Sequence, residues 1–540
     1  MEANARARPR RFGGIAPAEV QRRRARRSGA TGGVPAAAPA ADAAEGSVYG
    51  TEVRSRRSVE DLYGGAARGF EAVTDERTGE PCVLLRGGLP LGFPQSGALL
   101  RNGPNPRWAP APDGTHPFEG DGMVHRVEFG AGGRVTYSNR FVRTDALVEE
   151  ERRGGPIFSG IGFVQGSALW RNLAGNLLRG GAVQKPVSNT SVLEHGGKLL
   201  SLNEANKPVE LCRTTLESLG QPPFASSLLN GMCAHSRVCV ETGELVLHGC
   251  VYVGPSGPGL DYGVVSPGGE FVHRAFVPLP RASVMHDMAV LRRWTVLIDS
   301  PLSFSLARLA SGKRSIEFER GVCTRFGLLP RYGGADDIQW VTDEGEPFHV
   351  FHLANAFEEG DELVLLGCRL PGADLNPEGD GQLAGGTADL GILHEWRIDL
   401  RTMQLASQRQ LQEVGSDLPR VRDSLSGRPC RFCYSVRFAE EASKASSGPV
   451  FDALLKYDRQ TGETTAYDPG EGRYSGEAVF VARPGSDGGE DDGWLLSFVY
   501  DVATDSSELV VIDATTMRED ASFAMPRRVP FGFHGTWLGE

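Results

Sequence analysis

Short apolar runs, each ended by turn-forming residues, repeat along the chain from about residue 85 onward. Residues 198–202 read KLLSL and residues 294–299 read WTVLID, and similar runs occupy residues 243–253, 361–367 and 494–500. Each run is framed by Gly, Asp or Pro and is too short for most helices. The pattern therefore predicts a chain built mainly of short β-strands.

Turn residues between neighbouring runs indicate hairpins. In residues 457–467, two runs flank Thr461-Gly462, and the glycine supplies the positive φ that a tight turn needs. Many strands at near-regular spacing are typical of a sandwich, a barrel or a propeller, and periodicity alone does not choose among them. No WD or kelch signature repeats, so a search for repeats leaves the same three folds open.

One segment, residues 163–178, departs from the strand pattern. Phe163, Trp170, Leu173 and Leu177 stand at offsets 0, 7, 10 and 14, which is a helical period. Aromatic and basic residues near this stripe are typical of a helix that lies on a bilayer surface. A helix that packs on the protein core has the same period, so both interpretations stay open.

Composition indicates a globular, turn-rich protein. The 540 residues include 70 Gly and 34 Pro, and 40% are hydrophobic, which favours short strands over long helices. The formal net charge is −11, and because nucleic-acid binding needs a basic face, we expect no nucleic-acid partner. The sequence has no run of 18 apolar residues, so we expect no membrane-spanning helix.

The first 41 residues differ from the rest of the chain. They contain nine Arg, no Lys, and only Glu2 and Glu19 as acids. An Arg-rich, acid-poor start resembles an organellar transit segment, and plain disorder accounts for the same composition. We therefore divide the chain into a disordered or targeting segment, residues 1–47, and one folded domain, residues 48–540.

Nine cysteines, an odd number, are scattered through strand-like contexts, which is typical of reduced thiols in an intracellular compartment. Cys430 and Cys433 form one CxxC motif. A structural zinc site would need a second pair or nearby histidines, and a thioredoxin-like role would need a βαβ setting. Neither is visible, so we interpret the cysteines as buried, inert side chains.

Four histidines stand in short, distinctive contexts: Ala234-His235-Ser236, Met285-His286-Asp287, Phe351-His352-Leu353 and Phe533-His534-Gly535. Neutral imidazole is the commonest protein ligand for a first-row transition metal. Spacings of 51, 66 and 182 residues exclude a zinc finger or an HExxH helix, whose ligands lie within one local element. Folding must therefore bring these side chains together if they bind one metal.

These contexts and several other motifs carry a family resemblance. The motifs are RNGPNP at 101–106, FEGDGMVH at 118–125, LLSLNE at 199–204 and EDDGWLL at 490–496. With them, residues 85 to 537 resemble the carotenoid cleavage oxygenase family. FGLLPRY at 326–332, LASQ at 405–408 and RVPFGFH at 528–534 are most similar to the plant-type carotenoid 9,10(9′,10′)-cleavage dioxygenases within it.

The resemblance implies an all-β fold, a seven-bladed β-propeller with a cap of helices and loops over an axial iron site. In that fold, His235, His286, His352 and His534 would come from the inner strands of four blades and bind Fe(II) on the axis. Four imidazoles around octahedral iron leave two adjacent positions free, one for dioxygen and one for the approaching alkene.

The resemblance also assigns a carboxylate to three of the histidines, as the acceptor for the second ring nitrogen. By motif these are Glu204 in LNE, Asp417 in DLPR and Glu477 in GEAVF. Such acceptors hold an imidazole in the tautomer that binds metal. Asp417 replaces the glutamate of many relatives and is shorter by one C–C bond, about 1.5 Å. We expect it to act through a backbone shift or a water.

The implied activity is oxidative cleavage of a C=C bond of a carotenoid or apocarotenoid by O2, at the 9,10(9′,10′) position, giving carbonyl products. Alternatives are cleavage of the 11,12 bond of a 9-cis-epoxycarotenoid or of another polyene, and a non-cleaving propeller that binds lipids or partner proteins. No organic cofactor is implied, because GxGxxG and Walker A motifs are absent. The family takes lipids from membranes, so we expect a peripheral membrane surface as partner, and a plastid or cytoplasmic location.

The remaining histidines are interpreted as surface or satisfied core residues: His116, His125, His195, His248, His273, His349 and His394. His349 stands only three residues before His352. The Phe-His-x-x-Asn-Ala context of the family fits His352 alone, so the motif, and no physical argument, excludes His349.

Overall fold

Antiparallel strands make up most of the structure. The computed structural model describes residues 65–108, 117–160, 166–179, 185–204, 206–313, 315–373, 390–444, 446, 448–485 and 488–539. All of these belong to one unit, Arg57–Glu540. The segment predicted to be disordered or targeting, residues 1–47, lies outside the described residues.

Four sheets have four strands each, in sequential order. The first contains β6 (Ser191–His195), β7 (Lys198–Leu202), β8 (Val209–Leu211) and β9 (Ser218–Gly220). The second contains β10 (Arg237–Val238), β11 (Leu245–Val251), β12 (Gly259–Val265) and β13 (Phe271–Pro278). The third contains β14 (Met288–Val290), β15 (Trp294–Asp299), β18 (Arg325–Pro330) and β19 (Gln339–Thr342). The fourth contains β20 (His349–Glu359), β21 (Glu362–Leu370), β22 (Ile392–Asp399) and β23 (Gln404–Gln410).

A five-stranded sheet joins segments from both ends of the described chain. Its order is β1-β5-β4-β3-β33. The strands are β1 (Arg77–Pro81), β3 (Gly97–Pro104), β4 (Gly122–Gly130), β5 (Arg134–Phe141) and β33 (Gly535–Leu538). A separate two-stranded sheet pairs β16 (Leu302–Phe304) with β17 (Ile316–Phe318).

The largest sheet has ten strands and consists of two groups joined through β28 (Arg473–Ser475). One group contains β24 (Ser416–Arg420), β25 (Phe432–Phe438), β26 (Phe451–Asp458) and β27 (Thr464–Tyr467). The other contains β29 (Val479–Ala482), β30 (Gly493–Asp501), β31 (Ser506–Asp513), β32 (Arg518–Ala524) and β2 (Val83–Gly87). Through β2 and β33, residues more than 400 positions apart in sequence pair in the same sheets.

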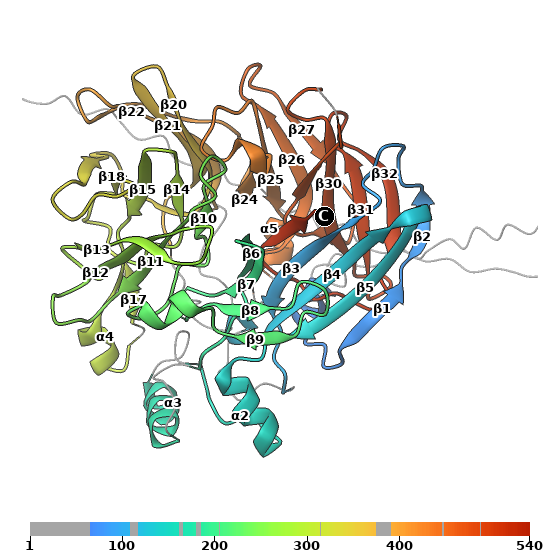
Figure 1. Cartoon of the computed structure of the whole chain (residues 1–540), viewed down its shortest axis with the longest axis horizontal. Coiled ribbons are helices and arrows are strands. Elements are labelled where there is room, and N and C mark those ends of the chain that lie inside the picture. The colour runs from blue at the N-terminus through green and yellow to red at the C-terminus, as the bar shows by residue number, and fades with distance from the viewer. Residues whose placement is uncertain are drawn as a thin grey trace, which may run out of the picture. The chain divides into compact units, whose positions relative to one another are not determined.

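Burial distinguishes strands that have a neighbour on both sides in their sheet from strands at the outer edge of the sheet. Every residue of β12, with the sequence GLDYGVV, is buried, whereas β23, with the sequence QLASQRQ, is almost wholly exposed. The inner strands of neighbouring sheets contact one another, with β14 between β10 and β20, and β24 beside β20. In Figure 1, β6, β10 and β24 lie towards the middle of the view, and β1, β13 and β32 lie at its periphery.

Helices are few and short. They are α2 (Asp145–Arg153), α3 (Gly166–Leu178), α4 (Leu306–Ala310) and α5 (Glu440–Lys444), with 3-10 turns at Ala67–Phe70, Pro117–Glu119, Ala131–Gly133, Pro223–Ser227 and Asp423–Leu425. Thr144 begins α2 by accepting a hydrogen bond from the Leu147 N–H, and Gly154 ends it in the left-handed conformation. None of the helices in the described ranges is long and apolar enough to cross a bilayer.

The structure confirms the strand pattern read from the sequence. The runs at 198–202 and 294–299 are β7 and β15, and the other three runs coincide with β11, β21 and β30 within a few residues. The hairpin predicted around Gly462 forms, with Tyr457 opposite Thr464 and a φ of 77° at the glycine. The expectation of an all-β fold is therefore confirmed at the level of fold class.

The helix predicted at 163–178 is also present, as α3. Phe163 lies outside the described residues. Of the predicted stripe, Leu173 is half-buried, and Trp170 and Leu177 are 45% and 54% exposed, whereas Leu169 beside the stripe is buried. The side of α3 that faces the protein instead buries Asn172 and Asn176.

Gly122, the first residue of β4, offers a test of the packing between sheets. A Cβ at this position would lie 1.8 Å from the carbonyl oxygen of Ser188, three residues before β6. We therefore expect Gly122→Ala to lower the free energy of unfolding by about 1–3 kcal/mol, because the backbone must shift. The control is Gly155→Ala, where a Cβ meets nothing within 4 Å. Thermal unfolding of both variants checks this, and equal stability of the two would contradict the packing.

Candidate metal centre

The four histidines singled out in the sequence come from four separate sheets. His352 lies within β20, while His235, His286 and His534 stand one or two residues before β10, β14 and β33. The expectation of four inner strands is thus met strictly only by His352, because the others lie in the segments that lead into those strands. The residues just before a strand do not take part in the hydrogen bonds between strands. Their backbone can therefore adopt a conformation that turns the histidine side chain towards the other three.

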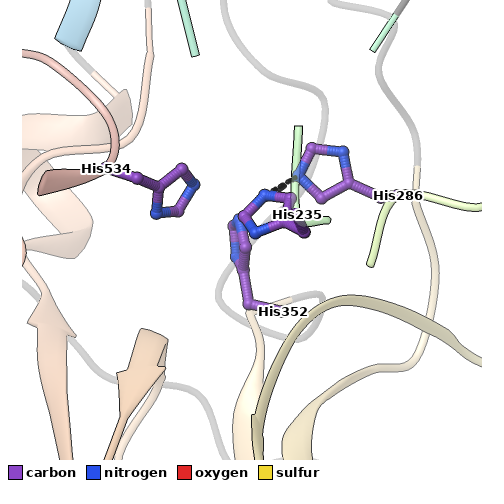
Figure 2. Close-up of side chains that lie close together, drawn as sticks. All are labelled: His235, His286, His352 and His534. Carbon is purple, nitrogen blue, oxygen red and sulfur yellow. Dashed lines mark hydrogen bonds between the residues drawn. The ribbon is translucent and has the colours of Figure 1, made fainter. Parts of the chain in front are cut away.

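The imidazole rings converge on one point. The Nε2 atoms of His235 and His286 are 3.1 Å apart, and those of His286 and His352 are 3.3 Å apart. One ring nitrogen from each of the four histidines lies within 4.8 Å of the others. Figure 2 shows the rings of His235, His286 and His352 grouped together with His534 facing them from the opposite side.

Three carboxylates contact the outer nitrogens of these rings. The Nδ1–H of His352 donates to Asp417 Oδ1 at 2.9 Å, and that of His534 donates to Glu477 Oε1 at 2.9 Å. The Nδ1 of His286 contacts Glu204 Oε1. The structure therefore places all three predicted carboxylates beside the histidines, each on the ring nitrogen that points away from the centre.

Asp417 reaches His352 directly, without the water that its shorter side chain was expected to need. Its Oδ1 also accepts the Leu418 N–H at 2.8 Å. Leu418 has a φ of 50°, and the pairing of β24 with β25 is irregular between Asp417 and Arg420. A left-handed leucine is rare, so this backbone is held in place by its surroundings and turns the carboxylate towards the imidazole.

His235 is the exception, because no carboxylate bonds it directly. The nearest is Asp287, whose Oδ2 lies 4.0 Å from His235 Nδ1. Asp287 is buried and accepts the Met288 N–H at 2.7 Å and the Leu353 N–H at 2.7 Å. It also forms an ion pair with Arg237 at 2.9 Å.

Burial and neighbouring charges set the protonation of the site. Burial, together with the other three imidazoles, holds the pKa of His235 well below its usual value. Burial opposes the charged form of His352 as well, but Asp417 outweighs it and raises the pKa of His352. Burial would raise the pKa of Glu477, yet Arg420 and His534 lower it to about 2. Glu477 therefore remains an anion at neutral pH.

The donor set fits a metal ion. Because the Nδ1 atoms of His352 and His534 carry the protons given to carboxylates, their Nε2 atoms present lone pairs to the centre. Lone pairs on Nε2 atoms that are 3.1 and 3.3 Å apart repel, and a shared cation relieves that repulsion. Imidazole suits first-row transition ions such as iron, copper and zinc.

Two different environments adjoin the histidines: a cavity that contains charged side chains, and a cluster of aromatic and aliphatic residues. A cavity of about 330 Å³ reaches His235, His352 and His534 and is lined by Arg237 and Arg420. Near His286, the ring of Phe351 packs edge-on at 5.4 Å between centroids. Partly buried apolar residues continue from Phe351 in one cluster: Tyr252, Ile316 and Phe318.

The remaining histidines stay apart from this group. His349 is buried, and its Nδ1 bonds the Ser300 hydroxyl, while its ring packs against Phe351. His125 bonds the Tyr137 hydroxyl at 2.7 Å. His116 lies outside the described residues. Within the described part of the chain, the four histidines are the one group of His, Cys, Asp and Glu side chains arranged to hold a metal, and all nine cysteines are free thiols.

Comparison with known proteins identifies the family. The family model described as "Retinal pigment epithelial membrane protein" matches residues 70–539. A carotenoid 9,10(9′,10′)-cleavage dioxygenase from Crocus sativus is 35% identical over 494 residues, covering 87% of this chain and 88% of the relative. The chain belongs to the carotenoid cleavage oxygenase family. The family prediction made from the motifs is thereby confirmed, and with it the expectation of an enzyme of the oxygen-incorporating type.

Other members of the carotenoid cleavage oxygenase family show how far the similarity extends. A chloroplastic 9-cis-epoxycarotenoid dioxygenase from Arabidopsis thaliana is 31% identical and covers 82% of this chain and 76% of the relative. Among solved structures, a cobalt-substituted apocarotenoid oxygenase from Synechocystis is 25% identical, with a TM-score of 0.77, covering 88% of this chain and 99% of that one.

Three polar residues of the site were not singled out from the sequence: Asp287, Arg237 and Arg420. Asp287 directly follows His286 and Arg237 stands two residues after His235, so proximity to a histidine was the available signal. Arg420 ends the DLPR motif that contains Asp417. Their roles depend on contacts between sheets, which the sequence does not display.

Removal of the Asp417 carboxylate tests whether it supports a metal ligand. We expect Asp417→Ala to weaken Fe(II) or Co(II) binding by about 10–100-fold, because His352 loses the acceptor that fixes its tautomer. Titration of the apo-protein with the metal measures the affinity, and circular dichroism monitors the fold. The control is Asp452→Ala on β26, which removes an ion pair with Arg437 on β25. Unchanged affinity in Asp417→Ala would contradict a supporting role.

Proposed function

We propose that the chain is an Fe(II)-dependent dioxygenase that cleaves a C=C bond of a carotenoid or apocarotenoid, with His235, His286, His352 and His534 as the iron ligands. The observation that carries the proposal is the convergence of four imidazoles with carboxylates behind three of them. Four neutral ligands leave the full charge of Fe(II) in place and leave room for further ligands. Iron held in this way supplies the binding and activation of dioxygen.

The chain's own residues orient the ligands and accept the substrate. Glu204, Asp417 and Glu477 keep the Nδ1 protons on His286, His352 and His534, so each Nε2 stays available to the metal. The aromatic cluster beside His286 gives a conjugated polyene an apolar surface on which to lie. The cavity that reaches His235, His352 and His534 holds the charged groups of Arg237 and Arg420, which a hydrocarbon chain would have to desolvate, so we place the polyene on the aromatic side.

The 9,10(9′,10′) bond is the position that we favour. Relatives named for cleavage at this bond, from Crocus sativus and Arabidopsis thaliana among others, are 33–35% identical to the chain. A second candidate is the 11,12 bond, because a 9-cis-epoxycarotenoid dioxygenase is 31% identical. The difference in identity is small, so the products must decide between the two bonds.

We also propose that the sheets form a seven-bladed β-propeller with a cap over the iron site. The ten-stranded sheet divides at β28 into two groups of four and five strands. With the four four-stranded sheets and the five-stranded sheet, this makes seven groups, each of the size of a propeller blade. The contacts between inner strands of neighbouring sheets support the same arrangement.

A membrane surface is the further partner that we propose, and α3 is the element that meets it. Trp170, Leu177 and Leu178 are 45%, 54% and 88% exposed. The protein-facing side is held by amide groups: Asn176 exchanges two hydrogen bonds with the Ser159 backbone, and Asn172 donates to the Gly160 carbonyl. Apart from the buried Leu169, the protein-facing side of α3 is thus polar and its exposed side carries large apolar groups, an arrangement that an apolar environment stabilises.

Product analysis tests the proposed reaction. We expect the Fe(II)-loaded protein to convert a carotenoid under air into two carbonyl fragments, both labelled when the O2 is isotopically labelled. Cleavage at 9,10 gives one ketone and one aldehyde, because C9 bears a methyl group, whereas cleavage at 11,12 gives two aldehydes. Mass spectrometry distinguishes them, with an anaerobic reaction and the His286→Ala variant as controls.

Either of two results would count against that reaction. Intact carotenoid in the presence of bound iron would favour another polyene or a non-cleaving propeller that binds lipids or partner proteins. Full turnover and iron content in His286→Ala would remove this histidine from the ligand set.

Vesicle binding tests the role of α3. We expect the double variant Trp170→Glu, Leu177→Glu to reduce partitioning onto lipid vesicles by about tenfold or more, because it places two charges where apolar area would be buried. Co-sedimentation measures the bound fraction. The matched control is Leu219→Glu, Val272→Glu, which alters side chains of similar exposure, 61% and 54%, on β9 and β13. An equal loss in both double variants would point to general charge repulsion.

A further inference from the structure

The Asp287 carboxylate connects three of the four histidine-bearing segments. It directly follows His286, accepts the N–H of Leu353 at 2.7 Å, and pairs with Arg237 at 2.9 Å. Leu353 is the neighbour of His352, and Arg237 lies two residues after His235. The same Arg237 nitrogen also donates to the Leu353 carbonyl at 2.8 Å. One arginine–aspartate pair therefore joins the inner edges of three sheets, at β10, β14 and β20.

A second arginine–carboxylate pair reaches the remaining segment. Arg420 donates through Nη1 to Glu477 Oε2 at 3.0 Å and to the Gly535 carbonyl at 2.9 Å. The Gly535 N–H returns a hydrogen bond to the same Glu477 oxygen at 2.8 Å. Because Gly535 follows His534 and Arg420 lies in the strand that carries Asp417, this pair ties the His534 segment to the acceptor of His352.

Strand β6 completes the circuit between the last histidine and the first. The His534 N–H donates to the Thr190 carbonyl at 3.1 Å. The hydroxyl of the next residue, Ser191, donates to the Ala234 carbonyl at 2.6 Å, directly before His235. The four histidine-bearing segments are thus linked in a closed ring of hydrogen bonds, directly or through β6 and β24. None of these hydrogen bonds uses an imidazole Nε2 atom.

The negative charge around the histidines accounts for the presence of two arginines, Arg237 and Arg420. Four carboxylates, those of Glu204, Asp287, Asp417 and Glu477, surround the four neutral imidazoles. A divalent ion would compensate two of these negative charges, and the guanidinium groups of Arg237 and Arg420 compensate the other two, although Arg420 also pairs with the exposed Asp423 at 2.8 Å. Buried charges are tolerated when they are paired and hydrogen-bonded, which both arginines achieve.

We propose that Arg237 and Arg420 are positioning residues that assemble the four histidines into a metal-binding arrangement before the metal arrives. This inference rests on the proposed function, because it assigns these arginines to the same metal centre. Neither arginine is a ligand. They act through Asp287, Glu477 and the backbone of Leu353 and Gly535, and they set the distance between segments that the metal would otherwise have to bring together.

Lysine substitutions separate this role from simple charge compensation. A lysine keeps the positive charge, but its compact, strongly hydrated ammonium group ends a shorter and more flexible side chain. The planar guanidinium of Arg237 instead holds one nitrogen, Nη2, against both Asp287 and the Leu353 carbonyl. We expect Arg237→Lys and Arg420→Lys to fold and to bind Co(II) about 10–100-fold more weakly than the unchanged protein. The Co(II) absorption spectrum should change as well, because the ligand geometry relaxes.

The matched control is Arg459→Lys. Arg459 pairs with the buried carboxylate of Glu395 at 2.9 Å and donates to the Cys430 carbonyl, and these bonds involve none of the residues that link the four histidine-bearing segments. Its guanidinium also lies over the ring of Phe357 on β20, five residues beyond His352, as a cation–π contact. Apo-protein melting temperatures, measured for all three variants, report the loss of a buried ion pair in general. Asp287→Asn serves as a second test of the Arg237 link, because it retains the size of the side chain and removes its charge.

The outcomes are distinct. Weakened Co(II) binding and an altered spectrum in Arg237→Lys and Arg420→Lys, with Arg459→Lys unchanged in both, support the proposal. Unchanged Co(II) binding in the first two variants and in Asp287→Asn overturns it, and so does a loss in Arg459→Lys of equal size. If the unchanged protein itself binds no Co(II) or Fe(II), the proposed metal function fails, and that result precedes any comparison of arginines.

Discussion

The structure around the histidines depends on contacts from Nδ1 outward to a carboxylate, which three of the four rings make. A neutral imidazole has one proton, and a carboxylate behind the ring decides that the proton stays on the far nitrogen. For His352 and His534 this is seen directly, at 2.9 Å in both cases. The inward nitrogens of these rings are then electron-pair donors, and their mutual repulsion favours a cation between them.

Such a centre needs rigid support, and the sheets provide it. Strands with continuous apolar sequences, such as β12 and β21, are buried and keep the inner edges of the sheets in fixed register. The ligand-bearing segments are short extensions of those edges. This explains how residues separated by up to 299 positions, His235 and His534, meet within a few ångströms. It also explains why the chemistry is carried by residues that precede strands more than by residues within them.

The sequence pattern predicted the elements whose formation depends on residues close together in the sequence, which are strands, hairpins and helices. Alternation of apolar runs and turns located β7 and β15 to the residue, and Gly462 located a hairpin. The helical period located α3 but did not reveal that Asn172 and Asn176 face inward, because their acceptors lie in another segment. The four histidines were recognised by their contexts. Asp287 and Arg237 were missed because their bonds to the Leu353 backbone join separate sheets.

The position of His534 near the end of the sequence means that it is translated long after the other three histidines. His235, His286 and His352 lie within 118 residues of sequence, whereas His534 comes 182 residues later and enters through β33, which pairs with β3. At ribosomal rates of about 5–20 residues per second, that interval corresponds to roughly 10–40 s. A nascent chain therefore presents an incomplete group of three imidazoles before the pocket is closed. For the metal site proposed above, the complete set of four ligands therefore exists only after β33 has been translated.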